Sequence, residues 1–131
     1  MMDKNAPLRQ LWLAAVLLTR LPLPHLPAAA FSQGPRAVWA YPVIGAAVGV
    51  CGMLSGSIAL ALGLPVSIAA ALSLAVMMIL TGAMHEDGLA DVFDGFWGGI
   101  TPERRLAIMR DSQIGTYGVL ALVLVCALKI S

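Results

Sequence analysis

The sequence predicts an all-α integral membrane protein. Of its 131 residues, 60% are hydrophobic and only 11% are charged, whereas about 25% are charged in a typical soluble domain. Mean hydropathy is +0.88, and the stretch from Ala37 to His85 contains no Asp, Glu, Lys or Arg. A net charge of +1 provides no basic field, so nucleic acid is not an expected partner. We expect one membrane-embedded domain over residues 1–131, with the lipid bilayer as its surroundings.

The first predicted element is a short helix over residues 8–21. Pro7 suits a first helical turn, and Pro22 and Pro24 end the apolar run. About 14 residues fall short of the ~20 that cross a bilayer, so we expect a half-span or an interfacial helix. Arg20 and the prolines separate this segment from the alanines of a cleavage-like site, so we expect it to be retained rather than removed as a signal peptide.

The uncharged stretch is long enough for a two-span helical hairpin. Gly63-Leu64-Pro65 supplies the turn, which predicts helices over residues 39–62 and 66–84. Basic residues flank the hairpin and are absent from its turn, so the positive-inside rule places the acidic segment that follows on the cytoplasmic side. Small residues spaced four apart allow helices to approach closely. The first helix has two such pairs, Gly45 with Gly49 and Gly52 with Gly56.

Acidic side chains are concentrated in one window of the chain. Of the seven acidic residues, all but Asp3 lie within residues 86–111. Successive helical residues turn by about 100°, which puts Asp87, Asp91 and Asp94 within roughly a 60° arc of one face. Their mutual repulsion predicts a bound cation, and hard cations such as Mg²⁺ join protein carboxylates to phosphates. The alternative is a solvated acidic helix end that follows a membrane span.

The acidic segment continues as a helix-loop-helix. Gly95 and the glycines after it are predicted to break the first helix. A second helix is predicted over residues 102–110, because Thr101 supplies a capping hydroxyl and a proline opens the first turn. The last apolar run, over residues 114–128, is short for a span, and we expect this third span to be truncated.

Four segments resemble the cobalamin synthase family, the adenosylcobinamide-GDP ribazoletransferases. The two most specific are residues 86–95 (EDGLADVFDG) and residues 104–118 (RRLAIMRDSQIGTYG). Residues 18–24 (LTRLPLP) and residues 41–45 (YPVIG) add two shorter matches. The family's chains are longer than this one, which resembles their N-terminal half.

The resemblance implies a multi-pass transferase of the bacterial cytoplasmic (inner) membrane. Its family joins adenosylcobinamide-GDP to α-ribazole, or to α-ribazole 5′-phosphate, and releases GMP. The ribose hydroxyl would attack the cobinamide-linked phosphate by Mg²⁺-assisted phosphoryl transfer. Two alternatives are a membrane phosphotransferase of the CDP-alcohol kind, whose Asp-x-x-Asp-Gly-x-x-Ala-Arg order is absent here, and a non-catalytic membrane subunit. The number of chains in a working unit, including a homo-oligomer, is left open.

The resemblance gives the acidic residues separate roles. Asp87 and Asp91 are predicted metal ligands. Asp94 is predicted to be a further ligand or the general base that takes the proton of the attacking hydroxyl. Asp111 would complete the catalytic site from the following helix. Glu86 lies off the acidic stripe and is predicted either to support the metal ligands or to stabilise the helix start.

Arginines and glycines near the motif are candidate substrate-binding residues. Arg104, Arg105 and Arg110 are predicted to clamp phosphate oxygens, or else to mark the cytoplasmic side. Arg110 is the one predicted to be catalytic, because it adjoins Asp111. Gly88 and Gly95 are predicted to let the backbone approach the ligand, with helix packing as the alternative.

Overall fold

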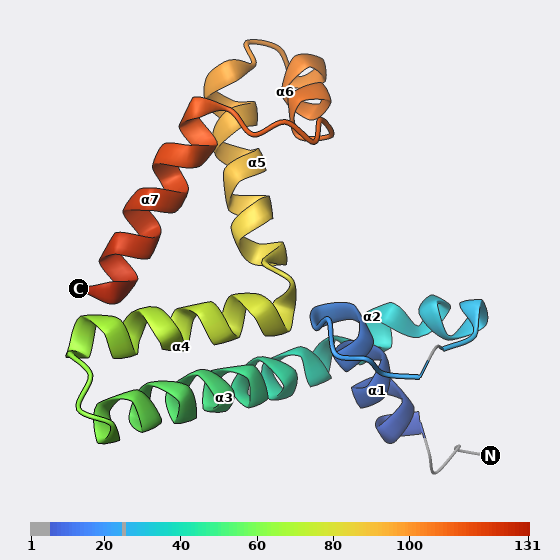
Figure 1. The fold of residues 1–131 in the computed structure, drawn as a ribbon. Helices are drawn as coiled ribbons and strands as arrows, with labels where there is room; N and C mark the ends of the chain where they lie inside the picture. Colours follow the sequence, from blue (N-terminus) through green and yellow to red (C-terminus); the bar gives the residue numbers. More distant parts are fainter. Residues whose placement is uncertain (1–5, 25) are drawn as a thin grey trace.

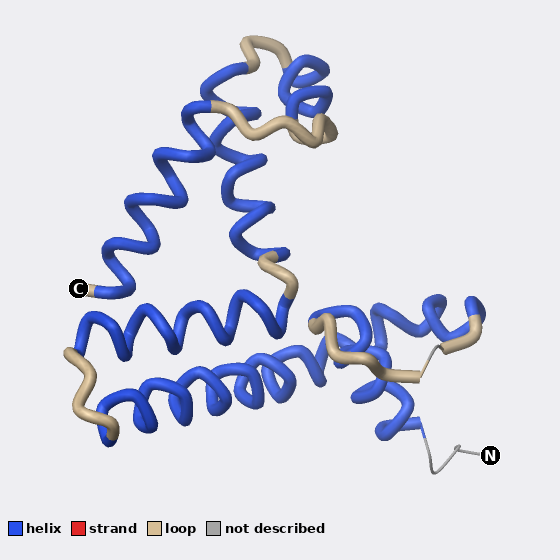
Figure 2. Tube along the Cα trace, in the orientation of Figure 1, coloured by secondary structure: helices blue, strands red, loops and turns tan. Residues whose placement is uncertain are grey.

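The computed structural model describes residues 6–24 and 26–131, and every regular element in these ranges is a helix (Figures 1 and 2). This confirms the predicted all-α class. The elements in chain order are α1 (Ala6–Leu18), the 3₁₀ helix η1 (Ala28–Gln33), α2 (Gly34–Ala37), the 3₁₀ helix η2 (Val38–Ala40), α3 (Tyr41–Ala61), α4 (Val66–Thr81), α5 (Met84–Gly98), α6 (Pro102–Ile108) and α7 (Thr116–Ile130).

The α3–α4 pair forms the predicted hairpin, but its two helices differ in length. Helices α2, η2 and α3 follow one another without a break from Gly34 to Ala61. This helical run has 28 residues and is long and apolar enough to cross a membrane. Helix α4 has 16 residues and is about 24 Å long, shorter than a bilayer core of about 30 Å. It meets the same test only together with α5, from which it is bent by 90°. One helix is therefore long and apolar enough to be a span, and α4 and α5 form a bent pair.

The bend between α4 and α5 was not predicted, since residues 66–84 were expected to form one helix. Gly82 and Ala83 both have left-handed backbones, with φ of 67° and 55°. The left-handed conformation costs Ala83 roughly 1–2 kcal/mol, so contacts near the bend must stabilise it. One such contact is the hydrogen bond from the Arg20 backbone N–H to the Leu80 carbonyl at 2.7 Å. This bond joins the N-terminal segment to the end of α4.

The hydrogen bond between Arg20 and Leu80 also explains why α1 ends at Leu18 rather than at residue 21. The Thr19 hydroxyl donates to the Ala15 carbonyl at 2.7 Å. After Thr19 the chain turns away from the helix axis so that Arg20 reaches the end of α4. The short helices η1, α2 and η2 were not anticipated. The Trp39 indole N–H donates to Gln10 Oε1 at 2.6 Å, so this segment is fixed to α1 just before α3 begins.

Glycines on α3 allow the close approach of α4. A Cβ at Gly52 would meet the side chain of Met77, and one at Gly56 would meet the Ser73 hydroxyl. The predicted contact through this pair is therefore confirmed. Gly45 and Gly49 face open space, so their predicted helix contact does not form with α4.

Gly56→Ala is expected to lower the free energy of unfolding by about 1–3 kcal/mol, the usual cost of overpacking. The added methyl would displace the Ser73 hydroxyl from the Ala69 carbonyl, to which it now donates at 3.1 Å. Thermal unfolding in detergent, followed by circular dichroism, measures the change. The matched control is Gly49→Ala, which should be neutral or stabilising because alanine favours a helix. Equal losses in both variants would show that α3 and α4 do not pack through Gly56.

Helices α5, α6 and α7 form the second half of the fold. In Figure 1, α5 extends upward from the end of α4, and α7 runs back down toward the start of α4. Helices α5 and α7 contact each other near α6. The predicted helix break is confirmed at Gly98 and Gly99, where α5 ends, but it is wrong for Gly95, which lies within α5. Gly95 instead packs against α6, where a Cβ would lie 2.6 Å from Met109 Cε. The predicted cap of α6 is confirmed: Thr101 Oγ1 accepts from the Arg104 N–H at 3.3 Å.

The outer faces of α3, α4 and α7 expose large apolar side chains. Examples are Ile58 on α3, Ile79 on α4 and Leu128 on α7, which are 61%, 73% and 75% exposed. Leu13 on α1 is the large side chain that is fully buried within the described ranges. A lipid-facing or partner-covered helix exposes such a surface.

Candidate functional site

A pocket of about 320 Å³ lies between α5 and the segment that follows α6. We call it the acidic pocket. One wall carries Asp87 and Asp91, and the other carries Arg110 and Asp111. Two residues four apart on a helix share a face, which is why α5 directs both of its carboxylates here. The pocket thus brings together three carboxylates and one guanidinium from two sequence motifs.

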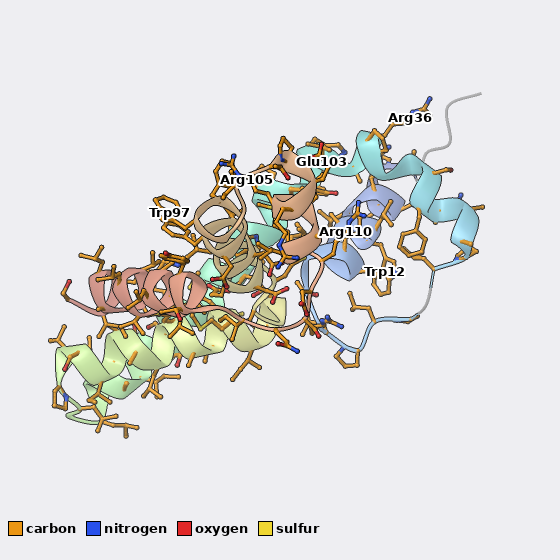
Figure 3. The ribbon with its side chains drawn as sticks, turned by 90° about the horizontal axis from the view of Figure 1, so that it is seen from above. Trp12, Arg36, Trp97, Glu103, Arg105 and Arg110 are labelled. Atoms are coloured by element: carbon orange, nitrogen blue, oxygen red, sulfur yellow. The ribbon has the colours of Figure 1, made fainter. Side chains whose placement is uncertain are left out.

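The second wall is shaped by a turn at the end of α6. Asp111 Oδ1 accepts from the Gln113 N–H at 3.2 Å, and the Asp111 N–H donates to the Ile108 carbonyl at 3.0 Å. Arg110, seen from above in Figure 3, extends from this turn. An Asp side chain that accepts a hydrogen bond from the backbone N–H two residues later in the chain stabilises such turns. The turn therefore holds Arg110 and Asp111 next to each other on this wall.

The carboxylates of the acidic pocket fit a cation site that water and substrate complete, rather than one formed by protein ligands alone. Within residues 6–24 and 26–131, no three His, Cys, Asp or Glu side chains are grouped closely enough to hold a metal ion by themselves. Mg²⁺ commonly binds one or two carboxylates and completes its shell with water and substrate phosphates. Asp87 and Asp91 match that need, with Asp111 facing them.

Asp94 lies outside the acidic pocket, although it shares the acidic stripe of α5. It is only 7% exposed, and both of its carboxylate oxygens accept backbone N–H groups: Oδ2 from Gly115 at 2.7 Å and Oδ1 from Gly118 at 2.8 Å. These donors belong to the first turn of α7, whose positive dipole end favours a negative charge. Asp94 therefore joins α5 to α7, and its role as ligand or base stays a prediction.

The remaining predicted residues are also placed away from the acidic pocket. Arg105 Nε donates to the Gly99 carbonyl at 2.8 Å, and its guanidinium lies 4.8 Å from the centre of the Phe96 ring; both contacts are local. Gly88 faces open space, which leaves its backbone accessible. Of the predicted site, the structure unites Asp87, Asp91, Arg110 and Asp111, and it leaves outside Gly88, Asp94, Gly95, Arg104 and Arg105.

Sequence reasoning missed three residues that line this pocket or the one beside it. Ser112 and Gln113 line the acidic pocket, and their position directly after Asp111 is the signal that could have identified them. Arg20 lines a neighbouring pocket together with Asp87. In the sequence, Arg20 belongs to the segment LTRLPLP and to the basic residues that precede the hairpin. Neither pattern indicates a site residue, because the proximity of Arg20 to α5 depends on the tertiary fold.

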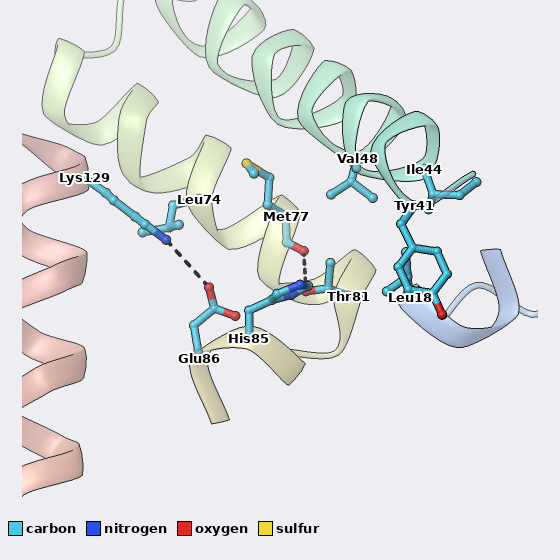
Figure 4. Close-up of a pocket in the computed structure, with 11 residues that line it drawn as sticks. Leu18, Tyr41, Ile44, Val48, Leu74, Met77, Thr81, His85, Glu86 and Lys129 are labelled. Atoms are coloured by element: carbon cyan, nitrogen blue, oxygen red, sulfur yellow. Dashed lines mark hydrogen bonds and ion pairs between the residues drawn. The ribbon is translucent and has the colours of Figure 1, made fainter. Parts of the chain in front are cut away.

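A third pocket, of about 420 Å³, has mostly apolar walls from α3 and α4 (Figure 4). Glu86 and Lys129 close one end, with Lys129 Nζ 4.0 Å from Glu86 Oε1. Glu86 Oε2 is buried and has no hydrogen-bond partner among the described residues. Glu86 therefore faces α7 and not the acidic pocket, in agreement with its predicted position off the stripe.

The fold and the acidic pocket define a helical protein of membrane-type composition with a polar site suited to a phosphorylated ligand. The comparisons with known proteins identify its family. The chain belongs to the cobalamin-5-phosphate synthase family, whose sequence profile matches residues 10–131.

Similar proteins carry the name adenosylcobinamide-GDP ribazoletransferase. The protein of Bradyrhizobium diazoefficiens is 51% identical over 117 residues, which are 89% of this chain and 45% of the relative. That of Mesorhizobium japonicum is 49% identical over 112 residues (86% and 43%), and that of Ralstonia nicotianae is 45% identical over 123 residues (92% and 47%). The chain thus spans about half the length of the relatives it matches. No solved structure matches it significantly.

Proposed function

We propose that this chain carries the phosphoryl-transfer site of an adenosylcobinamide-GDP ribazoletransferase. The reaction joins adenosylcobinamide-GDP to α-ribazole, or to its 5′-phosphate, and releases GMP. The observation that carries this proposal is the acidic pocket, where Asp87 and Asp91 face Arg110 and Asp111 across one cavity. The names of the similar proteins give the same reaction class.

The chemistry exchanges a phosphoanhydride bond of the diphosphate for a new phosphodiester bond. The acceptor hydroxyl oxygen forms a bond to the cobinamide-linked phosphorus, the bond from that phosphorus to the bridging oxygen breaks, and GMP leaves with the electron pair. Arg110 can hold the oxygens of the transferred phosphate bidentately. Asp111 is the better placed base for the hydroxyl proton, because it lines the pocket while both oxygens of Asp94 are engaged by α7.

Mg²⁺ is the proposed cofactor, with Asp87 and Asp91 as its protein ligands. When bound, it supplies charge neutralisation on the phosphate oxygens and on the departing GMP. The carboxylates themselves hold the cation, and Asp111 faces them from the opposite wall. Two carboxylates with a third nearby are typical of a cation site completed by substrate phosphates.

The proposed setting is the bacterial cytoplasmic membrane, with the acidic pocket on the cytoplasmic side. Helices α1, α2 and α5 gather at one end of the α3–α4 hairpin, opposite its turn (Figure 1). Arginines flank this end in sequence, and the turn at residues 62–65 has none. This distribution supports the orientation by the positive-inside rule.

Release of GMP in liposomes tests the proposal. The chain is assayed alone and together with the part of the Bradyrhizobium relative that it does not match, in the presence of adenosylcobinamide-GDP, α-ribazole and Mg²⁺. Omission of the ribazole or of the metal should abolish release. Release without ribazole would indicate a hydrolase, and release that persists in chelator would remove Mg²⁺ from the proposal.

A further inference from the structure

A cavity of about 500 Å³ adjoins the acidic pocket at Asp87. Its walls come from the end of α1 with the turn after it, from the end of α4 and from the start of α5. We call it the Arg20 pocket after the one basic side chain among its lining residues. Asp87 lines both cavities, so a ligand that reaches around this carboxylate can occupy both.

Arg20 is held in this cavity by contacts with the bend between α4 and α5. Its backbone N–H donates to the Leu80 carbonyl at 2.7 Å. Its side chain lies along Gly82, where an added Cβ would come within 2.7 Å of Nε and 3.1 Å of Cδ. The left-handed glycine at the bend thus leaves room for the guanidinium beside the start of α5.

The charge of Arg20 is not neutralised by a neighbouring acid. Among residues 6–24 and 26–131, no carboxylate lies within ion-pair distance of its guanidinium, although Asp87 shares the cavity. A guanidinium remains protonated at any physiological pH and matches phosphate oxygens bidentately. An exposed arginine fixed in a cavity next to a carboxylate is therefore well suited to a phosphate group.

We propose that Arg20 binds the phosphate that GMP retains, while Arg110 binds the phosphate that is transferred. This inference rests on the proposed function. The acceptor attacks next to Asp111, so the transferred phosphate must lie at the Arg110 wall. The second phosphate of the diphosphate can then enter the adjoining Arg20 pocket, where Arg20 is the basic side chain.

The test is the affinity of the chain for GMP, measured by equilibrium dialysis in detergent with Mg²⁺ present. Arg20→Gln should weaken GMP binding at least tenfold, which corresponds to about 1.4 kcal/mol, and should raise the KM for adenosylcobinamide-GDP. Arg20→Lys should weaken binding less, because it keeps the charge but not the bidentate geometry. The matched control is Arg36→Gln, an exposed arginine on α2 that lines neither pocket, and its GMP affinity should be that of the original chain.

Each outcome separates this inference from the proposed function. If the unchanged chain releases GMP and Arg20→Gln binds GMP with unaltered affinity, the role of Arg20 is refuted while the transferase remains. If the unchanged chain neither binds nor releases GMP, both fail. If Arg20→Gln does not fold, Arg20→Lys decides, since full affinity in that variant would contradict bidentate phosphate binding.

Discussion

Asp91→Asn is expected to slow GMP release at least a hundredfold, which is a loss of about 2.7 kcal/mol of transition-state stabilisation. Asparagine keeps the size of the side chain but removes the negative charge that would hold a divalent cation opposite Arg110. The folded state should be nearly unaffected, because no hydrogen bond or ion pair joins the Asp91 side chain to another residue in the described part of the chain. Initial rates at saturating substrates, with and without Mg²⁺, measure the effect.

The control for this prediction is Glu103→Gln. Glu103 is an exposed acid on α6 that does not line the acidic pocket (Figure 3). Its neutralisation changes net charge by the same amount as Asp91→Asn, so its rate should remain within about twofold of the original. Full activity in Asp91→Asn would mean that the acidic pocket is not the site of phosphoryl transfer, and would favour a non-catalytic subunit.

Asp94→Ala is expected to lower the free energy of unfolding by about 3–6 kcal/mol. Each of its two hydrogen bonds involves a charged acceptor, a type worth roughly 1.5–3 kcal/mol, and truncation leaves buried N–H groups without a partner. The charge that favours the first turn of α7 is lost as well. Thermal or denaturant unfolding in detergent micelles measures the difference.

The comparison for this variant is Thr101→Ala. Thr101 caps α6 through one bond of 3.3 Å at an exposed site, so its loss should cost about 0.5–1 kcal/mol. If Asp94→Ala were no less stable than Thr101→Ala, the tie between α5 and α7 would not be an important part of the fold. A variant that is stable but inactive would instead support the predicted role of Asp94 as ligand or base.

Local chemistry explains which features of the fold were predictable. Thr101 and Pro102 signal a helix start through their own side chains, and α6 begins there. Gly63-Leu64-Pro65 interrupts the apolar stretch, and the hairpin turns at that point. In each case the information lies within a few residues, so no knowledge of distant contacts is needed.

Tertiary contacts determined the features that were not predicted. Ala83 has no sequence signal for a left-handed backbone, and its conformation accompanies the hydrogen bond between Arg20 and Leu80. Gly95 appeared to be a helix breaker, yet its missing side chain makes room for α6. Spacing on a helix also could not reveal that α7 covers Asp94 but leaves Asp91 beside the acidic pocket.

The identity and ratio of the products test the central proposal most directly. The chain, alone and with the unmatched part of the Bradyrhizobium relative, is incubated with adenosylcobinamide-GDP, α-ribazole and Mg²⁺, and the products are quantified by mass spectrometry. A ribazoletransferase predicts one ribazole-containing corrinoid for each GMP released, and at least a hundredfold slower formation of both products by the Asp91→Asn variant. GMP without the corrinoid product, or no product in either preparation, would contradict it.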